Sequence, residues 1–236
     1  NGKRLLIDFG LTAPYIYRDE LGLDFRDIDG IYISHNHSDH WGALPLLAFS
    51  RYFLPKRDTN GNPVRPKLFC VPELMKELWE NSLRGDLESI EGKVMNITDY
   101  FDCRPVNINS CFYWNGYKFE PVQTVHVMSG YKINYSYGLM ITSPEGSLLR
   151  SRVFITTDTQ FCPYQLIKFY SEAKTIFQDC ETLVGFKSHV HAHYDDLNTL
   201  SPEIKKKMYL YHYGDKRDAE ADGFAGFVDK GQEFDL

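Results

Sequence analysis

Residues 35–40 read HNHSDH and directly follow the apolar run GIYIS. Histidine is scarce in solvated loops, yet here it occupies positions i, i+2 and i+5. On an extended segment His35 and His37 point to the same side, so two imidazoles can reach one ion. Asp39 and His40 then require a turn, which would aim the second pair at a neighbouring ion. Packing gains nothing from such a cluster, and polar side chains buried without partners are costly. We therefore predict a metal site.

The other histidines and two aspartates occupy similar places in the chain. Of the eight histidines, three lie in SHVHAHY (residues 188–194) and two more each close an apolar, strand-like run. A single histidine at a strand end is more often structural than a ligand, but polar residues gathered at strand ends are what a rigid scaffold supplies to a site. The candidates outside residues 35–40 are Asp8, His126, Asp158, His189, His191, His193 and His212.

Composition indicates an ordinary globular protein. The chain has 236 residues, of which 43% are hydrophobic and 25% charged, and this length can bury a sizeable core. No apolar run approaches the roughly 20 residues of a membrane-spanning helix. The net charge of −6 argues against a broad electrostatic grip on nucleic acid. Five cysteines without CxxC spacing favour free thiols in a reducing cytoplasm.

Short apolar runs separated by helical patterns predict an α/β fold with antiparallel hairpins and outer helices. Asn115-Gly116 is a strong hairpin-turn signal. Asn1-Gly2 is another, and the strand that should precede it is missing from the sequence. The expected strands cover residues 3–9, 30–34, 67–71, 118–127, 135–142, 152–157, 174–179 and 208–212. The expected helices cover residues 42–54, 72–83, 163–172 and 202–207, and the last three each begin with proline.

Taken in order, these motifs resemble the metallo-β-lactamase superfamily, whose HxHxDH signature matches HNHSDH. The resemblance implies one domain over residues 1–236 with an αββα sandwich of two mixed sheets and outer helices. It also implies two metal ions, zinc first and manganese or iron as alternatives. It assigns His35, His37 and His126 to one ion, and Asp39, His40 and His212 to the other, with Asp158 bridging. Asp8 is expected to orient ligands.

The segment from residue 176 to residue 215 is similar to the phosphodiesterase branch of that superfamily, which holds tRNA 3′-processing endonucleases and cyclic-nucleotide phosphodiesterases. In that branch a histidine serves as proton donor. His193, steered by Asp179, is the preferred match, and His191 is the competing assignment. With Asp39, His193 makes up the predicted catalytic pair. The tRNA-processing enzymes have a His-Glu pair where this chain has Gln178-Asp179.

The short connection between His126 and Asp158 leaves no room for the long arm with which tRNA-processing enzymes grip tRNA. Together with the net charge, this favours a small cyclic nucleotide as the substrate. The chain also resembles the phage proteins that destroy cyclic-nucleotide signals in anti-Pycsar defence. Three alternatives stay open: an RNA endonuclease, a hydrolase of another ester such as a thioester or lactone, and a metal-stabilised binding protein without activity. The branch further suggests a homodimer, and the lack of a long apolar run predicts no membrane partner.

Overall fold

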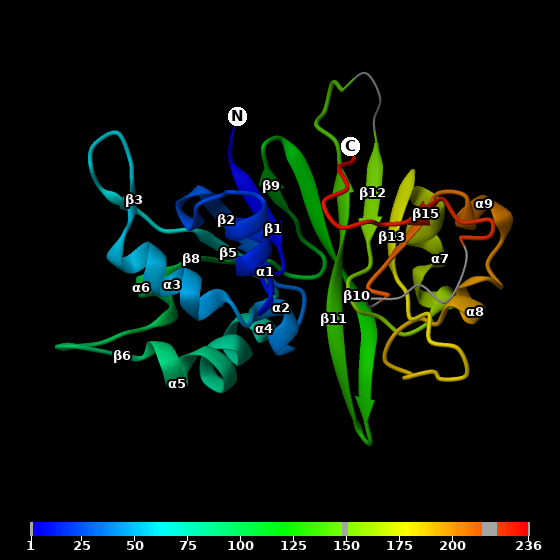
Figure 1. The fold of residues 1–236 in the computed structure, drawn as a ribbon, viewed down its shortest axis with the longest axis horizontal. Helices are drawn as coiled ribbons and strands as arrows, with labels where there is room; N and C mark the ends of the chain where they lie inside the picture. Colours follow the sequence, from blue (N-terminus) through cyan, green and yellow to red (C-terminus); the bar gives the residue numbers. More distant parts are fainter. Residues whose placement is uncertain (1, 148–150, 214–220, 236) are drawn as a thin grey trace. The chain divides into compact units, whose positions relative to one another are not determined.

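The computed structural model describes residues 2–147, 151–213 and 221–235 (Figure 1). Asn1, half of the predicted Asn1-Gly2 turn, lies outside the described residues. The chain divides into two compact units, Asn1–Asn107 and Ile108–Leu236. Each unit contains one main β-sheet. That the chain forms a single domain stays a prediction.

The first unit is built on a four-stranded sheet in the order β1-β2-β5-β8, and its strands all run parallel. β2 is a central strand and is buried along nearly its whole length, as is usual in a parallel sheet. The main strands are β1 (Arg4–Ile7), β2 (Ile28–Tyr32), β5 (Lys67–Cys70) and β8 (Asp102–Pro105). Two small ribbons pair β3 (Lys56–Arg57) with β4 (Pro63–Val64), and β6 (Ser89–Ile90) with β7 (Lys93–Val94).

The helix α3 (Leu44–Phe53) packs by the face that carries Leu44, Leu47, Ala48 and Arg51, the spacing expected of an amphipathic helix. The arginine on this buried face donates to the carbonyl oxygens of Ile28 at 2.6 Å and Val64 at 2.7 Å, which pairs both terminal nitrogens of its guanidinium. The remaining helical segments of this unit are α1 (Ala13–Tyr15), η1 (Ile16–Glu20), η2 (Phe25–Asp27), α2 (Ser38–Trp41), α4 (Pro72–Glu77), η3 (Leu78–Leu83), α5 (Arg84–Leu87) and α6 (Ile97–Tyr100).

The second unit contains a seven-stranded mixed sheet in the order β15-β14-β13-β12-β11-β10-β9. Strands β9 to β12 pair antiparallel, and strands β12 to β15 pair parallel. The predicted turn at Asn115-Gly116 joins β9 to β10, and both residues have positive φ. The strands are β9 (Phe112–Trp114), β10 (Tyr117–Ser129), β11 (Lys132–Thr142), β12 (Arg152–Ile155), β13 (Thr175–Asp179), β14 (Met208–Tyr211) and β15 (Gly226–Phe227).

Helices α7 (Pro163–Glu172), α8 (Tyr194–Leu197) and α9 (Pro202–Lys205) contribute to one buried apolar cluster with strands β12 to β14. Leu166 of α7, Phe154 of β12 and Met208 of β14 are fully buried in this cluster. Among the residues that the structure describes, no helix has both the length and the apolar character needed to cross a bilayer.

The parallel strands place the candidate residues of the second unit at one sheet edge. Asp158 follows three residues after β12, Asp179 is the last residue of β13, and His212 directly follows β14. Because neighbouring parallel strands end on the same side, these side chains are brought together although they are far apart in the sequence.

The core of the second unit gives a direct test of the fold. Phe154 is completely buried, and its ring lies 5.6 Å from that of Phe169 and 6.0 Å from that of Tyr170. We predict that Phe154→Ala lowers the free energy of unfolding by about 3–5 kcal/mol because it leaves a cavity. Urea unfolding measures the change. Phe186, which is 57% exposed, provides the control, since Phe186→Ala should change stability by no more than about 0.5 kcal/mol.

Candidate metal centre

The first unit brings the histidines of HNHSDH together. The Nε2 of His35 lies 3.1 Å from the Nδ1 of His37, so the predicted shared side of these two residues is confirmed. The chain then turns into α2, which carries Asp39 and His40. The His35 and His40 rings lie 4.1 Å apart between centroids, and the Nε2 of His40 lies 3.6 Å from a carboxylate oxygen of Asp39.

Asp8 anchors this cluster from the end of β1. Its carboxylate accepts hydrogen bonds from the backbone N–H and the hydroxyl of Ser34, both at 2.8 Å, and from the Nδ1 of His40, also at 2.8 Å. Because the hydroxyl proton of Ser34 goes to Asp8, its oxygen must accept from the Nδ1 of His35 at 2.9 Å. A neutral imidazole that donates through Nδ1 carries its lone pair on Nε2. Asp8 therefore sets the tautomers of His35 and His40, in keeping with its predicted orienting role.

In the second unit Asp158 faces two imidazoles. Its Oδ2 lies 3.7 Å from the Nε2 of His126, and its Oδ1 lies 3.9 Å from the Nε2 of His212. These distances exceed a hydrogen bond, whereas two atoms bound to one zinc at about 2.0–2.2 Å can be up to about 4.4 Å apart. The Nδ1 of His126 donates to the carbonyl of Val190 at 2.9 Å, so its Nε2 carries the lone pair. The second unit thus fits a shared carboxylate between two cations.

A second carboxylate lies beside this arrangement. Asp179 is fully buried and accepts from the backbone N–H of Thr159 at 2.8 Å and from the Nδ1 of His191 at 2.9 Å. Its other oxygen lies 3.1 Å from the Nδ1 of His212. Burial lowers the pKa of His191, but the hydrogen bond and charge of Asp179 outweigh burial and leave this pKa raised. The pair can therefore hold a proton next to the candidate metal ligands.

The predicted pairing of His193 with Asp179 is wrong. His193 caps the start of α8, where its Nδ1 accepts from the backbone N–H of Asp195 at 3.2 Å and its Nε2 donates to the carbonyl of Leu183 at 3.0 Å. Both ring nitrogens therefore contact backbone, and Asp179 contacts His191 instead. The acidic residues Asp195 and Asp196, which follow in the first turn, were a sequence signal for a helix start at His193.

Backbone conformations that are unusual for residues other than glycine occur next to the candidate metal ligands. Asp8, Thr157 and His212 have φ values of 62°, 54° and 67°, in the left-handed region that residues other than glycine seldom adopt. Each stands at or just beyond the end of a strand and beside a candidate ligand. Such conformations persist where the surrounding structure fixes them, and they concentrate at functional sites.

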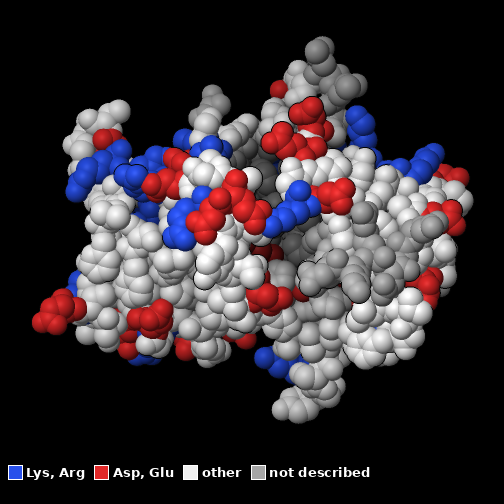
Figure 2. Space-filling model, viewed as in Figure 1, with Lys and Arg blue, Asp and Glu red and all other residues white. Residues whose placement is uncertain are grey.

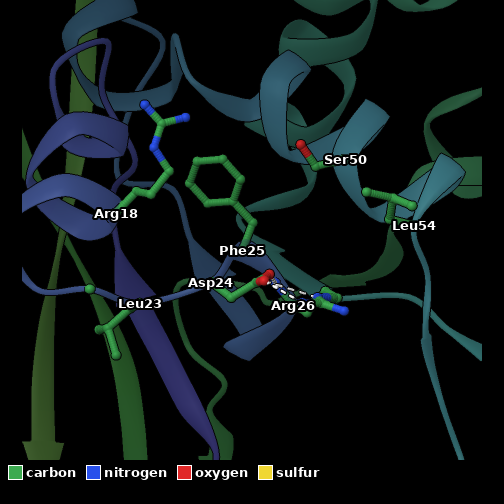
Figure 3. Close-up of a pocket in the computed structure, with 8 residues that line it drawn as sticks. Arg18, Leu23, Asp24, Phe25, Arg26, Ser50 and Leu54 are labelled. Carbon is green, nitrogen blue, oxygen red and sulfur yellow. Dashed lines mark hydrogen bonds and ion pairs between the residues drawn. The ribbon is translucent and has the colours of Figure 1, made fainter.

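A cavity of about 520 Å³ lies in the first unit and is lined in part by Arg18, Phe25 and Leu54 (Figure 3). Its charged groups are already paired, because Arg18 contacts Asp19 at 2.7 Å and Arg26 contacts Asp24 at 2.6 Å. None of the predicted site residues lines it, so this cavity is separate from the candidate metal centre.

Comparison with known proteins identifies the family. The sequence profile described as "Anti-Pycsar protein Apyc1" matches residues 1–234. The chain belongs to this family. Relatives of that name include a protein of Paenibacillus harenae, 33% identical over 220 residues, which cover 92% of this chain and 81% of the relative. Another, from Bacillus phage vB_BveM-Goe7, is 30% identical over 250 residues, covering 100% of this chain and 88% of the relative.

Solved structures similar to this Apyc1 family member confirm the predicted metallo-β-lactamase fold. The metallo-β-lactamase fold protein YhfI from Bacillus subtilis aligns with a TM-score of 0.61 at 15% identity, over 90% of this chain and 77% of YhfI. The short form of human tRNase Z aligns with a TM-score of 0.60 at 15% identity, over 90% of this chain and 83% of that protein. At these identities the likeness establishes the fold alone.

The predicted ligands of this family member come from both units of the chain. His35, His37, Asp39 and His40 belong to the first unit, and His126, Asp158 and His212 to the second. Their assignment to common ions stays a prediction. No sequence pattern predicts the roles of Ser34, Thr159 or the carbonyl of Val190, since serine, threonine and backbone carbonyls carry no distinctive spacing.

Gly10 tests how the first-unit ligands are positioned. A Cβ added to this glycine would lie 1.6 Å from the carbonyl oxygen of Asp39, so Gly10→Ala must displace the turn that carries Asp39 and His40. We predict a loss of at least about 1–3 kcal/mol in stability and a lower metal content per chain, measured by urea unfolding and elemental analysis. Gly85 has open space around it, and Gly85→Ala is the control. Undiminished metal binding by Gly10→Ala would contradict this positioning.

Proposed function

We propose that this protein is a metal-dependent phosphodiesterase that hydrolyses the phosphodiester of a cyclic nucleotide. The observation that carries the proposal is the geometry of Asp158, whose two oxygens face two different imidazoles, in a chain of the Apyc1 family. Anti-Pycsar proteins act against cyclic-nucleotide signals, which supplies the substrate class. The predicted cytoplasmic location and homodimer stay predictions.

The proposed metal ligands follow from the resemblance and suit the donor chemistry. His35, His37 and His126 would hold one ion and Asp39, His40 and His212 the other, with Asp158 shared. Mixed nitrogen and oxygen ligands favour zinc first, then manganese or iron. Such ions, when bound, supply positive charge opposite the phosphate oxygens and make water more acidic. Asp8, Ser34 and the carbonyl of Val190 direct the lone pairs of three imidazoles, which is the orientation that ligation requires.

His191 is the proposed proton donor to the leaving ribose oxygen. Its Nδ1 is held by Asp179, so its Nε2 can present a proton when the ring is charged. Thr159 fixes the Asp179 carboxylate through its backbone N–H, which keeps the imidazole in one orientation. Proton donation of this kind contributes about 10²–10⁴ in rate. Asp39, whose side chain is 65% exposed, is proposed to act both as a ligand and as an acceptor for a proton of the attacking water.

Surface charge favours a small anion over RNA. On the face drawn in Figure 2, the described lysines and arginines are interspersed with aspartates and glutamates, and the net charge is −6. Proteins that bind nucleic acid broadly depend on gathered positive charge.

Variants of His191 and His193 test which of these two histidines is the proton donor. We predict that His191→Ala lowers kcat on a 3′,5′-cyclic nucleotide by about 10²–10⁴ because the leaving alkoxide needs a proton. The same variant should keep most of its activity on methyl p-nitrophenyl phosphate, since nitrophenolate leaves without protonation, and its metal content should stay unchanged. His193→Ala should mainly lower stability. If His193→Ala, rather than His191→Ala, showed the selective loss on the cyclic nucleotide, the assignment to His191 would be overturned.

A substrate panel tests the proposed function itself. The purified protein, loaded with zinc or manganese, should hydrolyse 3′,5′-cyclic mononucleotides, and chelation of the metal should abolish turnover. The panel includes 2′,3′-cyclic nucleotides, methyl p-nitrophenyl phosphate and a precursor tRNA. Cleavage of the precursor tRNA alone would select an endonuclease, and recovery of every nucleotide intact would select a binding protein.

A further inference from the structure

A pocket of about 250 Å³ lies in the second unit beside His191. Its lining includes Gln160, Phe161, Lys187 and His189. None of these four residues has a place in the proposed metal centre. Because His191 is the proposed donor to the leaving ribose oxygen, a group bound in this pocket would lie next to the nucleoside side of the scissile bond.

Gln160 presents an oriented hydrogen-bond acceptor. Its Nε2 donates to the backbone carbonyl of His126 at 2.9 Å, and its own backbone N–H donates to the carbonyl of Val125 at 2.8 Å. A backbone carbonyl can only accept, so the amide group cannot be reversed, and its Oε1 must point away from His126. No described donor forms a hydrogen bond with this oxygen. This oxygen is therefore available to accept an N–H of a ligand.

His189 is the one histidine that neither the fold nor the proposed metal centre uses. It is exposed, and no described residue forms a hydrogen bond or ion pair with its ring. Its φ is 61°, a conformation that costs about 1–3 kcal/mol outside glycine. The neighbouring Ser188 holds the loop, because its backbone N–H and hydroxyl both donate to Glu181, at 2.8 Å and 3.0 Å. The loop therefore fixes the backbone of His189 at the rim of the pocket, and the imidazole is not used for packing.

The rest of the pocket suits a flat, partly polar ligand. Phe161 is half-buried against the core of the second unit and also lines the pocket, so its ring offers an aromatic surface. Lys187 pairs with Asp196 at 2.7 Å, which holds the rim on one side. Aromatic surfaces with a few placed polar groups are the usual composition of small-molecule sites, and every nucleobase has a face that can stack.

We propose that this pocket binds the base of the cyclic nucleotide. Gln160 accepts an N–H from the base through Oε1, and His189 and Phe161 contact its faces. The inference rests on the proposed phosphodiesterase function and extends it, because it assigns substrate selection to residues outside the metal ligands. Substitutions in the pocket should therefore affect substrates that carry a base and spare those that do not.

His189→Ala tests the assignment, and His189→Asn accompanies it because asparagine tolerates positive φ better than alanine. We expect both variants to lower kcat/KM for 3′,5′-cyclic nucleotides by about tenfold, the loss corresponding to about 1.4 kcal/mol. Activity on methyl p-nitrophenyl phosphate, which has no base, should stay within twofold of wild type. The control is Val184→Ala, on the same loop but outside the pocket lining and 81% exposed. It should match wild type on both substrates.

Equal losses on both substrates, or no loss on the cyclic nucleotides, would overturn the inference. Binding of a hydrolysis-resistant cyclic phosphorothioate, measured by calorimetry, keeps the test independent of turnover. His189→Ala should weaken this binding by about tenfold even if the wild-type protein hydrolyses nothing, a result that would count against the proposed function alone. Unchanged binding in the variant would count against the base pocket alone.

Discussion

The proposed chemistry depends on the fixed orientation of imidazole rings. His35, His40 and His126 each donate through Nδ1 to an oxygen that belongs to the rigid scaffold: the Ser34 hydroxyl, the Asp8 carboxylate and the Val190 carbonyl. The hydrogen bond selects one tautomer and leaves the lone pair on Nε2, where a cation can use it. Without these anchors the rings could rotate or exchange tautomers, and a site assembled from distant segments would lose its geometry.

The fold supplies those anchors at the ends of parallel strands. Asp8 follows β1, while Asp158, Asp179 and His212 follow or end β12, β13 and β14. Parallel pairing brings these ends to one edge of each sheet, and left-handed backbone at Asp8, Thr157 and His212 redirects the chain there. At His126 the register of β10 against β11 shifts between Val125 and Val127. This bulge re-aims a strand residue. Local strain and irregular pairing are thus concentrated where side chains must be directed.

Much of this arrangement can be predicted from the sequence. HNHSDH indicates a candidate metal site because three histidines in six positions have no packing explanation. Asn115-Gly116 predicts its turn because both residues can adopt positive φ. β8, with the sequence DCRP, was not predicted, since a charged edge strand that ends in proline carries no apolar alternation. The hydrogen-bond partners of the histidines in HVHAH (residues 189–193) could not be predicted from the sequence either. His191 and His193 differ by two positions, and only the isolated bridge between Glu181 and His193, together with the start of α8, decides which of them meets Asp179.

Neighbouring groups in the second unit have separate proposed tasks: Asp158 binds the cations, the Asp179–His191 pair transfers a proton, and the pocket at His189 binds the base. The central proposal is the shared carboxylate of Asp158. Anomalous X-ray diffraction at the zinc edge, on crystals grown with zinc, measures this most directly. We predict two peaks per chain, both within about 2.0–2.2 Å of an Asp158 oxygen, one also bonded to His126 and the other to His212. A single peak, or two peaks that do not contact Asp158, would contradict the account.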